Sequence, residues 1–194
     1  MALDSMQEIF EKAAAEQIPS WKVVLETDVE QRQVTEEQSM EKMGLTWQAM
    51  LESVTTYQGE ERSRSGLVGG DGARRRRYAE RGGGLCGAYL REVVATALSV
   101  GESNACMRKI VAAPTAGACG VLPAVLVPLY QAGMVSEEQI IQALYTASGI
   151  GAVIGYRACI AGAAGGCQAE IGTASAMAAG ALASIQGGTA AQIG

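Results

Sequence analysis

Residues 161–180 read AGAAGGCQAEIGTASAMAAG, and this stretch indicates which class of fold the chain adopts. Small residues recur in it every three or four positions, so helices can approach one another backbone to backbone along such a face. Glycine is abundant in the rest of the chain as well, with 25 among 194 residues. Strand patterns are weak throughout. We therefore predict an all-α fold whose close-packed, Ala/Gly-rich helices form the core.

Apolar periodicity and helix-capping patterns predict where the other helices lie. The predicted helices cover residues 4–17, 35–58, 85–101, 121–129 and 136–148. Thr35 with Gln38, and Ser136 with Gln139, form capping-box patterns at the start of two of them. An amphipathic helical region over residues 1–60 is thus expected to precede a less charged helical part.

The charge of the chain argues against nucleic acid as a partner. The formal net charge is −5 at pH 7, whereas proteins that bind phosphate backbones use basic surfaces. The one run of basic residues, Arg74–Arg77, is predicted to be a solvated loop rather than a phosphate-binding patch.

Three uncharged stretches, residues 110–136, 139–156 and 171–194, have the length of membrane-spanning helices. Their residue types favour a buried helical core instead. The first contains Pro114, Pro123 and Pro128, and the last holds few large apolar side chains. Residues 1–20 lack the apolar segment of a secretion signal. We therefore expect no membrane association and a cytoplasmic location.

The chain contains no histidine and five cysteines. Ser-His-Asp catalysis, Cys-His catalysis and His-ligated zinc are therefore excluded. The cysteines are Cys86, Cys106, Cys119, Cys159 and Cys167. Their odd number and the absence of a C-x-x-C pair argue against a disulfide framework and against a self-contained zinc site. Any one of them, taken alone, is expected to be a small buried apolar side chain.

Two loops carry residue patterns that suit an anion. Residues 62–71 read RSRSGLVGGD, in which two arginines alternate with two serines and glycines follow. Residues 114–120 read PTAGACG and open an apolar helix. Both patterns can direct hydroxyls and backbone N–H groups at an anion. The first pattern, taken alone, more often indicates a flexible turn.

Three blocks of sequence together resemble one family. They are residues 62–71, residues 110–126 (IVAAPTAGACGVLPAVL) and residues 164–180 (AGGCQAEIGTASAMAAG). In this order they are similar to the α subunit of iron–sulfur-dependent L-serine dehydratase (L-serine ammonia-lyase), from about residue 35 to residue 194. The resemblance implies a mainly helical catalytic domain, which we expect over residues 61–194, after the amphipathic region of residues 1–60.

The resemblance also implies a cofactor, a reaction and a partner. A [4Fe–4S] cluster on three cysteines would keep one iron open to bind the substrate hydroxyl and carboxylate as a Lewis acid. L-Serine would lose water to give aminoacrylate, which hydrolyses to pyruvate and ammonia. Such an electrophile suits a chain without histidine, because hydroxide is a poor leaving group and the Cα proton is weakly acidic. The two-subunit form of the family implies a β subunit as partner, with or without a homo-oligomer.

Carried over to this chain, the resemblance places one cluster ligand at Cys167. The two loops match segments of the family that line the substrate site. We therefore expect substrate contacts from Ser63, Ser65, Gly66, Thr115 and Gly117. The residue that removes the Cα proton is not assigned by the sequence.

Other features depart from the family pattern. The family's two further cluster cysteines follow a Gly-Gly-Thr-x-x-Gln segment, which lies here at residues 187–192, and the sequence ends at Gly194. One thiolate does not hold such a cluster firmly. The chain is therefore expected to be a C-terminally truncated catalytic domain, inactive alone, with the remaining ligands beyond Gly194. Serines of the family pattern are also replaced by Ala118, Cys159 and Ala161.

Two other functions are compatible with the sequence. A pyridoxal-phosphate-dependent serine/threonine dehydratase would form its Schiff base on a lysine such as Lys109, although no βα pattern surrounds that residue. A non-catalytic helical partner, or a membrane-associated module, would use the Ala/Gly surfaces for association.

Overall fold

The computed structural model of the chain describes residues 4–82 and 84–194. Within these residues the regular structure consists of ten α-helices and one short 3-10 helix, without a strand. The predicted all-α fold is thus confirmed. Residues 1–3 of the predicted N-terminal region lie outside the described residues.

The helices belong to two compact units, which are described separately. Unit 1 is formed by residues 1–47 and 135–194, and unit 2 by residues 48–134. Unit 1 contains α1 (Met6–Glu16), α2 (Ser20–Arg32), the first part of α3 (Glu36–Thr55), α7 (Glu137–Arg157), α8 (Gly162–Gly165), α9 (Cys167–Ile185) and α10 (Ala190–Ile193). Unit 2 contains the rest of α3, α4 (Asp71–Glu80), α5 (Ala88–Ala105), the 3-10 helix η1 (Ala116–Ala118) and α6 (Val121–Gln131). The predicted division assigns catalysis to residues 61–194 and an N-terminal helical region to residues 1–60. The two compact units do not test that assignment, so it stays a prediction.

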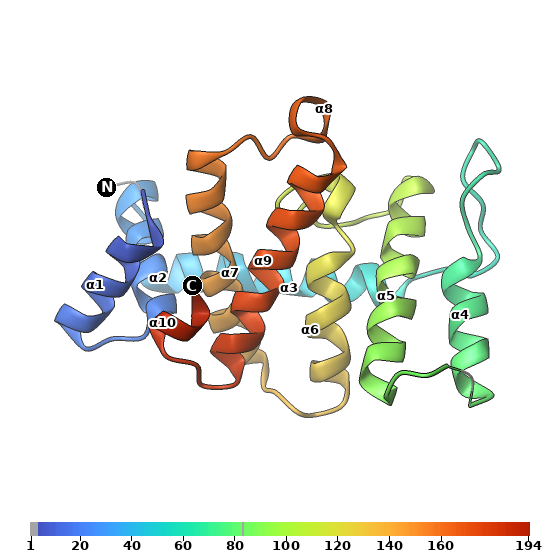
Figure 1. Cartoon of the computed structure of the whole chain (residues 1–194), viewed down its shortest axis with the longest axis horizontal. Coiled ribbons are helices and arrows are strands. Elements are labelled where there is room, and N and C mark those ends of the chain that lie inside the picture. Colours follow the sequence, from blue (N-terminus) through green and yellow to red (C-terminus); the bar gives the residue numbers. More distant parts are fainter. Residues whose placement is uncertain (1–3, 83) are drawn as a thin grey trace. The chain divides into compact units, whose positions relative to one another are not determined.

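In unit 1, α7 and α9 pack closely against each other (Figure 1). A Cβ atom at Gly180 of α9 would lie 2.0 Å from Cδ1 of Ile150 on α7, and one at Gly151 would lie 2.8 Å from Sδ of Met177. The glycines therefore admit large side chains of the opposite helix, as the small-residue repeat predicts. A second apolar cluster, in which α1 and α2 meet α7, is centred on buried Ile9, Val23, Leu25 and Tyr145.

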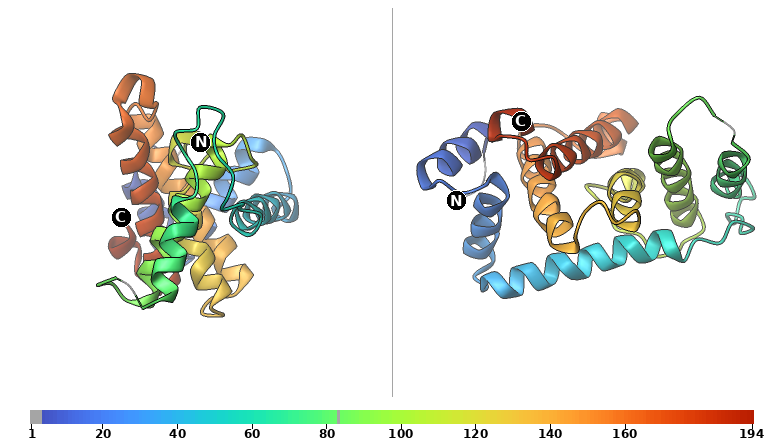
Figure 2. Two further views of the ribbon diagram at one scale, coloured as in Figure 1. Left: turned by 90° about the vertical axis from the view of Figure 1, so that its right-hand side faces the viewer. Right: turned by 90° about the horizontal axis from the view of Figure 1, so that it is seen from below.

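In unit 2, α5 packs between α4 and α6 (Figure 2). A Cβ atom at Gly72 of α4 would lie 2.6 Å from the Ser99 hydroxyl of α5, and one at Gly120 would lie 2.8 Å from the carbonyl oxygen of Ala97. Both neighbours of α5 thus approach its backbone through a glycine. Among the described residues, no helix combines the length and the apolarity needed to cross a bilayer.

The capping patterns mark helix starts as predicted. Gln38 accepts a hydrogen bond from the Thr35 N–H at 2.9 Å, and Thr35 Oγ1 accepts one from the Gln38 N–H at 3.2 Å. Ser136 and Gln139 form the same reciprocal pair at the start of α7. That helix continues past the predicted end at residue 148 to Arg157.

The prediction that Arg74–Arg77 form a solvated loop is wrong, because these residues lie inside α4. Arginine is a good helix former. The run also finds acidic partners: Arg74 pairs with Asp71 one turn earlier at 2.8 Å, and Arg76 approaches Glu92 of α5 at 3.9 Å. The first N–H groups of α4 also donate to the carboxylate of Glu102 on α5. The sequence pattern alone does not reveal this contact.

Candidate functional site

The loop of residues 62–70, which leads into α4, is hydrogen-bonded to itself. The Ser63 N–H donates to the Val68 carbonyl at 2.8 Å, and the Val68 N–H donates to Ser63 Oγ at 3.1 Å. The Gly66 N–H closes the turn on the Ser63 carbonyl at 2.8 Å. Because Ser63 is buried and both its backbone and its side chain serve these bonds, its hydroxyl holds the loop in shape.

The tip of the same loop is open to solvent. Ser65 and Gly66 are exposed. Gly66 has a φ of +75°, and a Cβ atom added there would have no heavy atom within 4 Å. Ser65 Oγ lies 3.1 Å from Ser63 Oγ. Of the three residues predicted in this loop, Ser65 and Gly66 are therefore the ones accessible to a ligand.

The end of this loop is fixed by Glu102, which is only 5% exposed. Its carboxylate accepts hydrogen bonds from the Asp71 N–H at 2.6 Å and the Gly72 N–H at 3.3 Å, and from the Tyr57 hydroxyl. The N-cap residue of α4 is Gly70, which has no side chain to receive these N–H groups. Glu102 of α5 therefore caps α4 from a neighbouring helix.

Tyr57 completes this buried cluster. Its hydroxyl donates to Glu102 and accepts from the Ala73 N–H at 3.2 Å. Burial, and then the hydrogen bond to the Glu102 carboxylate, raise the pKa of Tyr57 to about 12. The tyrosine thus stays a hydrogen-bond donor at neutral pH.

The start of the loop is held by an ion pair. Arg108, just beyond α5, donates to both carboxylate oxygens of Glu61, with Nε and Nη2 at 2.8 to 3.1 Å from them. This hydrogen bonding lowers the pKa of Glu61. The geometry is the bidentate one that gives such pairs directional specificity.

The second loop, residues 113–120, is attached to α5 as well. Asn104 Nδ2 donates to the Ala116 carbonyl at 3.0 Å. The Thr115 and Ala116 carbonyls accept from the N–H groups of Ala118 and Cys119, which forms η1. Gly117 is exposed in this turn.

Thr115 carries the most informative polar atom of this loop. Its Oγ1 is buried, and it finds no hydrogen-bond partner among the described residues. A buried hydroxyl without a partner costs about 1–3 kcal/mol, so native proteins seldom keep one without a reason. A ligand whose oxygen reached this hydroxyl would supply the missing partner.

Both loops are therefore held by the same end of one helix. Glu102 and Arg108 fix the ends of the first loop, and Asn104 fixes the second. The predicted residues Ser63, Ser65, Gly66, Thr115 and Gly117 thus lie in two loops that are each bonded to residues near the C-terminal end of α5.

Cys167, the predicted cluster ligand, belongs to unit 1 and is the first residue of α9. It is exposed. In the same helical turn, the Glu170 side chain packs on Gly162 of α8, where a Cβ atom would lie 2.3 Å from its Oε2. Cys167 thus presents a free thiol at a helix start.

The described residues do not by themselves fit a three-thiolate cluster. Within residues 4–82 and 84–194, no three Cys, His, Asp or Glu side chains gather closely enough to hold a metal ion. Burial raises the pKa of Cys106 and of Cys119, which keeps both thiols protonated, whereas a metal ligand is a thiolate. Cys86 and Cys159 are exposed.

Lys109, the lysine considered for a Schiff base, is exposed and forms an ion pair. Its Nζ lies 2.5 Å from Oε2 of Glu52, and its side chain is 59% exposed. A Schiff-base lysine is instead expected in a desolvated pocket. The geometry gives no support to pyridoxal-phosphate chemistry at this residue.

Sequence reasoning missed the residues that hold the two loops. They are Tyr57, Glu61, Glu102, Asn104 and Arg108. One signal was available for Glu102, because it is the one charged residue between residues 93 and 107 and needs a partner when buried. Its partners are backbone N–H groups, which no residue pattern reveals.

Comparison with known proteins gives consistent matches. The family model described as serine dehydratase alpha chain matches residues 15–194. The probable L-serine dehydratase, alpha chain, of Bacillus subtilis (strain 168) is 36% identical over 185 residues, which are 95% of this chain and 62% of that protein. The L-serine dehydratase, alpha chain, of Peptoniphilus asaccharolyticus is 38% identical over 191 residues, 98% of this chain and 65% of that protein. An L-serine dehydratase of Mycobacterium tuberculosis is 46% identical over 101 residues, 50% of this chain and 22% of that protein.

The all-α chain with its two anchored loops therefore belongs to the serine dehydratase alpha chain family. Within that family it is similar over nearly its whole length to L-serine dehydratase alpha chains, which confirms the resemblance drawn from the three sequence blocks. The chain spans less than two thirds of the length of these two relatives.

Proposed function

We propose that the chain provides substrate-binding loops of an L-serine dehydratase, which converts L-serine to pyruvate and ammonia. The proposal is supported by the family and by the names of the relatives that the chain matches. The observation that carries it is the buried, unpaired hydroxyl of Thr115, in a loop that the family resemblance assigns to the substrate site.

The proposed roles of the loop residues follow from their exposure and hydrogen bonds. Thr115 Oγ1 donates to an oxygen of L-serine, which gives this hydroxyl the partner that it lacks. Gly117, Ser65 and Gly66 are exposed at the turns of the two loops and contact the substrate from there. Ser63 acts indirectly, because its hydroxyl holds the loop that presents Ser65.

The reaction removes the Cα proton and the Cβ hydroxyl of L-serine. One water molecule leaves, aminoacrylate remains, and hydrolysis of its imine tautomer consumes one water and yields pyruvate and ammonia. Charge develops as the Cα–H and Cβ–O bonds break. The two loops therefore have to hold the substrate in one orientation and limit the access of water to it. The base that takes the Cα proton is not identified among the described residues.

We further propose that Cys167 is one ligand of a [4Fe–4S] cluster and that the other ligands come from outside the 194 residues. The exposed thiol of Cys167 supports this role. The described residues contain no three-ligand group, so the proposal assigns the other ligands to residues outside them. When bound, such a cluster supplies a Lewis acid. A β subunit is the proposed partner, in keeping with the relatives' designation as alpha chains.

Replacement of Cys167 tests the cluster proposal. In the holoenzyme that contains this chain, purified without oxygen, Cys167→Ser is expected to abolish the visible charge-transfer absorbance and to lower the bound iron to background. Cys86→Ser, which changes another exposed thiol, serves as the matched control and should keep both. Full iron content in the Cys167→Ser protein would contradict the assignment.

Replacement of Thr115 by valine tests the proposed function directly. Valine has the shape of threonine without the hydroxyl. The folded chain loses no hydrogen bond, so the free energy of unfolding is expected to stay the same or to rise slightly. In the holoenzyme, kcat/KM for L-serine is expected to fall roughly tenfold or more, because a hydrogen bond to a charged ligand is lost.

The control for this substitution is Thr146→Val in α7, where a buried hydroxyl donates to the Gln142 carbonyl. It should lower stability slightly and leave kcat/KM unchanged. An unchanged kcat/KM in the Thr115→Val enzyme would refute the role of Thr115. Failure of the unmodified holoenzyme to form pyruvate from L-serine would refute the proposed function itself.

A further inference from the structure

Unit 1 contains a pocket whose lining includes no residue of the two loops. It lies where α2, the first part of α3 and α7 meet, and its volume is about 220 Å³. Hydroxyls, two cationic side chains and a small apolar surface share its lining. The lining residues are Val24, Thr27, Asp28, Gln31, Arg32, Ser39, Lys42, Met43, Thr46, Tyr145, Ser148 and Ala152. Apolar walls with a few convergent polar groups are typical of small-molecule sites, and this one has room only for a small ligand.

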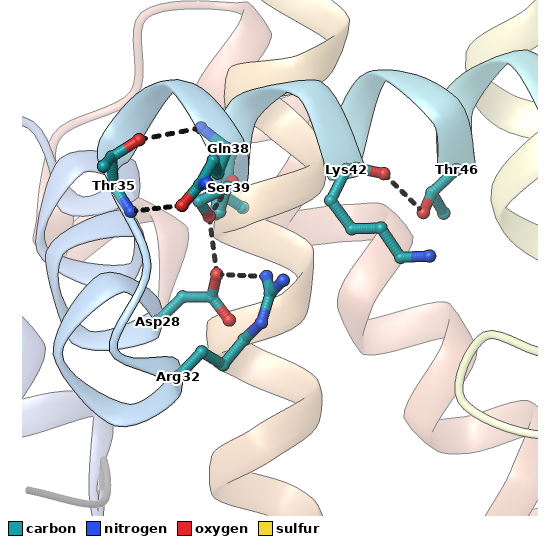
Figure 3. Close-up of polar contacts among 8 residues, drawn as sticks. Asp28, Arg32, Thr35, Gln38, Ser39, Lys42 and Thr46 are labelled. Carbon is teal, nitrogen blue, oxygen red and sulfur yellow. Dashed lines mark hydrogen bonds and ion pairs between the residues drawn. The ribbon is translucent and has the colours of Figure 1, made fainter.

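One wall of the pocket is a fixed hydrogen-bond network (Figure 3). Ser39 Oγ lies 2.5 Å from Oδ2 of Asp28 and 2.6 Å from the Tyr145 hydroxyl. An ionised carboxylate only accepts, so Ser39 donates to Asp28 and Tyr145 donates to Ser39. Ser39 and Tyr145 are 1% and 2% exposed. The side chains of this wall are therefore held in place by their own hydrogen bonds.

The pocket lining carries two cationic side chains, Arg32 and Lys42, and one carboxylate, Asp28. Asp28 is the one carboxylate among the described lining residues, and it already accepts from Arg32 Nη1 at 2.8 Å as well as from Ser39. The remaining charge is the ammonium group of Lys42, an exposed residue that forms none of the ion pairs found among the described residues. The other three lysines each pair with a glutamate: Lys12 with Glu26, Lys22 with Glu36 and Lys109 with Glu52.

Lys42 and Arg32 both line the pocket. In Figure 3 both side chains lie on the same side of α3, with the Lys42 ammonium group turned away from the Arg32 guanidinium. Arg32 has five N–H donors, and the ion pair with Asp28 uses one on Nη1. The lining thus contains a compact positive charge and a planar set of donors, both of which suit an anion.

We propose that this pocket binds a small aliphatic carboxylate. The ligand's carboxylate pairs with Lys42 and accepts from Arg32, while Thr46 and Ser148 offer further hydroxyls. Its short carbon chain contacts Val24, Met43 and Ala152. The site shares no residue with the two loops that hold the proposed substrate contacts, and the inference does not depend on the proposed function.

The test uses butyrate as the probe and the full 194-residue chain, with binding followed by NMR titration. Butyrate has no amino group and no hydroxyl, so it does not mimic L-serine. Lys42→Met keeps the length of the apolar stem and removes the charge, and it is expected to weaken butyrate binding roughly tenfold or more. Lys12→Met changes the net charge equally at a paired lysine, and it should leave the affinity unchanged.

A second variant tests the cavity rather than the charge. Ala152 is exposed on α7 and lines the pocket, so Ala152→Phe is expected to fill it and abolish butyrate binding while the circular dichroism of the chain stays unchanged. Equal butyrate affinity in the unmodified chain and in Lys42→Met would overturn the proposal. So would an equal loss in Lys12→Met. Tighter binding of inorganic phosphate than of butyrate, with the same dependence on Lys42, would overturn the assignment to a carboxylate.

Discussion

Glu102→Ala is expected to lower the free energy of unfolding by about 3–5 kcal/mol, because three donors lose one buried acceptor together. They are the N–H groups of Asp71 and Gly72 and the hydroxyl of Tyr57. Alanine leaves a cavity at a position only 5% exposed, and the first turn of α4 then has no capping acceptor. For a chain of this length the loss corresponds to a fall in Tm of roughly 10 °C.

Urea titration followed by circular dichroism measures this change. Glu92→Ala, which removes a partly exposed carboxylate from the same helix, is the control and should change stability by less than about 0.5 kcal/mol. Glu102→Gln keeps an acceptor oxygen and most of the volume, so it should fall between the two. Equal stability of the Glu102→Ala and Glu92→Ala proteins would show that Glu102 does not cap α4.

A local measurement separates loop anchoring from general stability. The first loop carries Arg62 and Arg64, both exposed, where trypsin can cut. If Glu102 fixes the end of this loop, Glu102→Gln is expected to speed tryptic cleavage there under conditions in which the rest of the chain is still folded. A rise in cleavage that only parallels global unfolding would argue against a positioning role.

The fold could be predicted from the sequence to the extent that it depends on local pattern. The capping pairs at Thr35 and Ser136, and the small residues that recur at helical spacing, act within a few residues, so the pattern reports them directly. The helix around Arg74–Arg77 could not be predicted in the same way. Its capping carboxylate, Glu102, is 31 residues away from Asp71 along the chain, and only the packing of α4 on α5 brings the two together.

The sequence predicts candidate site residues, whose contact with substrate stays a prediction, but it does not show how each residue is held in the fold. Both serines of the first loop directly follow an arginine, and the sequence treats them alike. The structure separates them, because Ser63 is buried and bonded to the loop backbone while Ser65 is exposed. Thr115 stands out only once burial and hydrogen bonds are known together. Neither quantity is encoded in a short motif.

The second large effect is expected at Gly69, where alanine should cost about 3 kcal/mol or more. Gly69 has a φ of +136°, and a Cβ atom there would lie 2.3 Å from the carbonyl oxygen of Glu61 and 3.2 Å from the Arg62 Cα. These are backbone atoms, so the added methyl group cannot be accommodated by a side-chain rotation. The chain would have to move the whole loop that presents Ser65.

Gly66→Ala is the matched control for this change, because it lies in the same loop and also has a positive φ, of +75°. No heavy atom lies within 4 Å of its added Cβ atom, so the cost is limited to the left-handed conformation, about 1 kcal/mol. Urea titration of both variants, with tryptic cleavage at Arg62 and Arg64 as the local readout, measures the difference. If the two substitutions cost the same, the close approach of the Gly69 and Glu61 backbones does not hold the loop in place. If alanine costs about 2 kcal/mol more at Gly69 than at Gly66, the backbone contact holds the loop in addition to its hydrogen bonds. Any ligand bound at the tip of the loop then meets a preorganised turn.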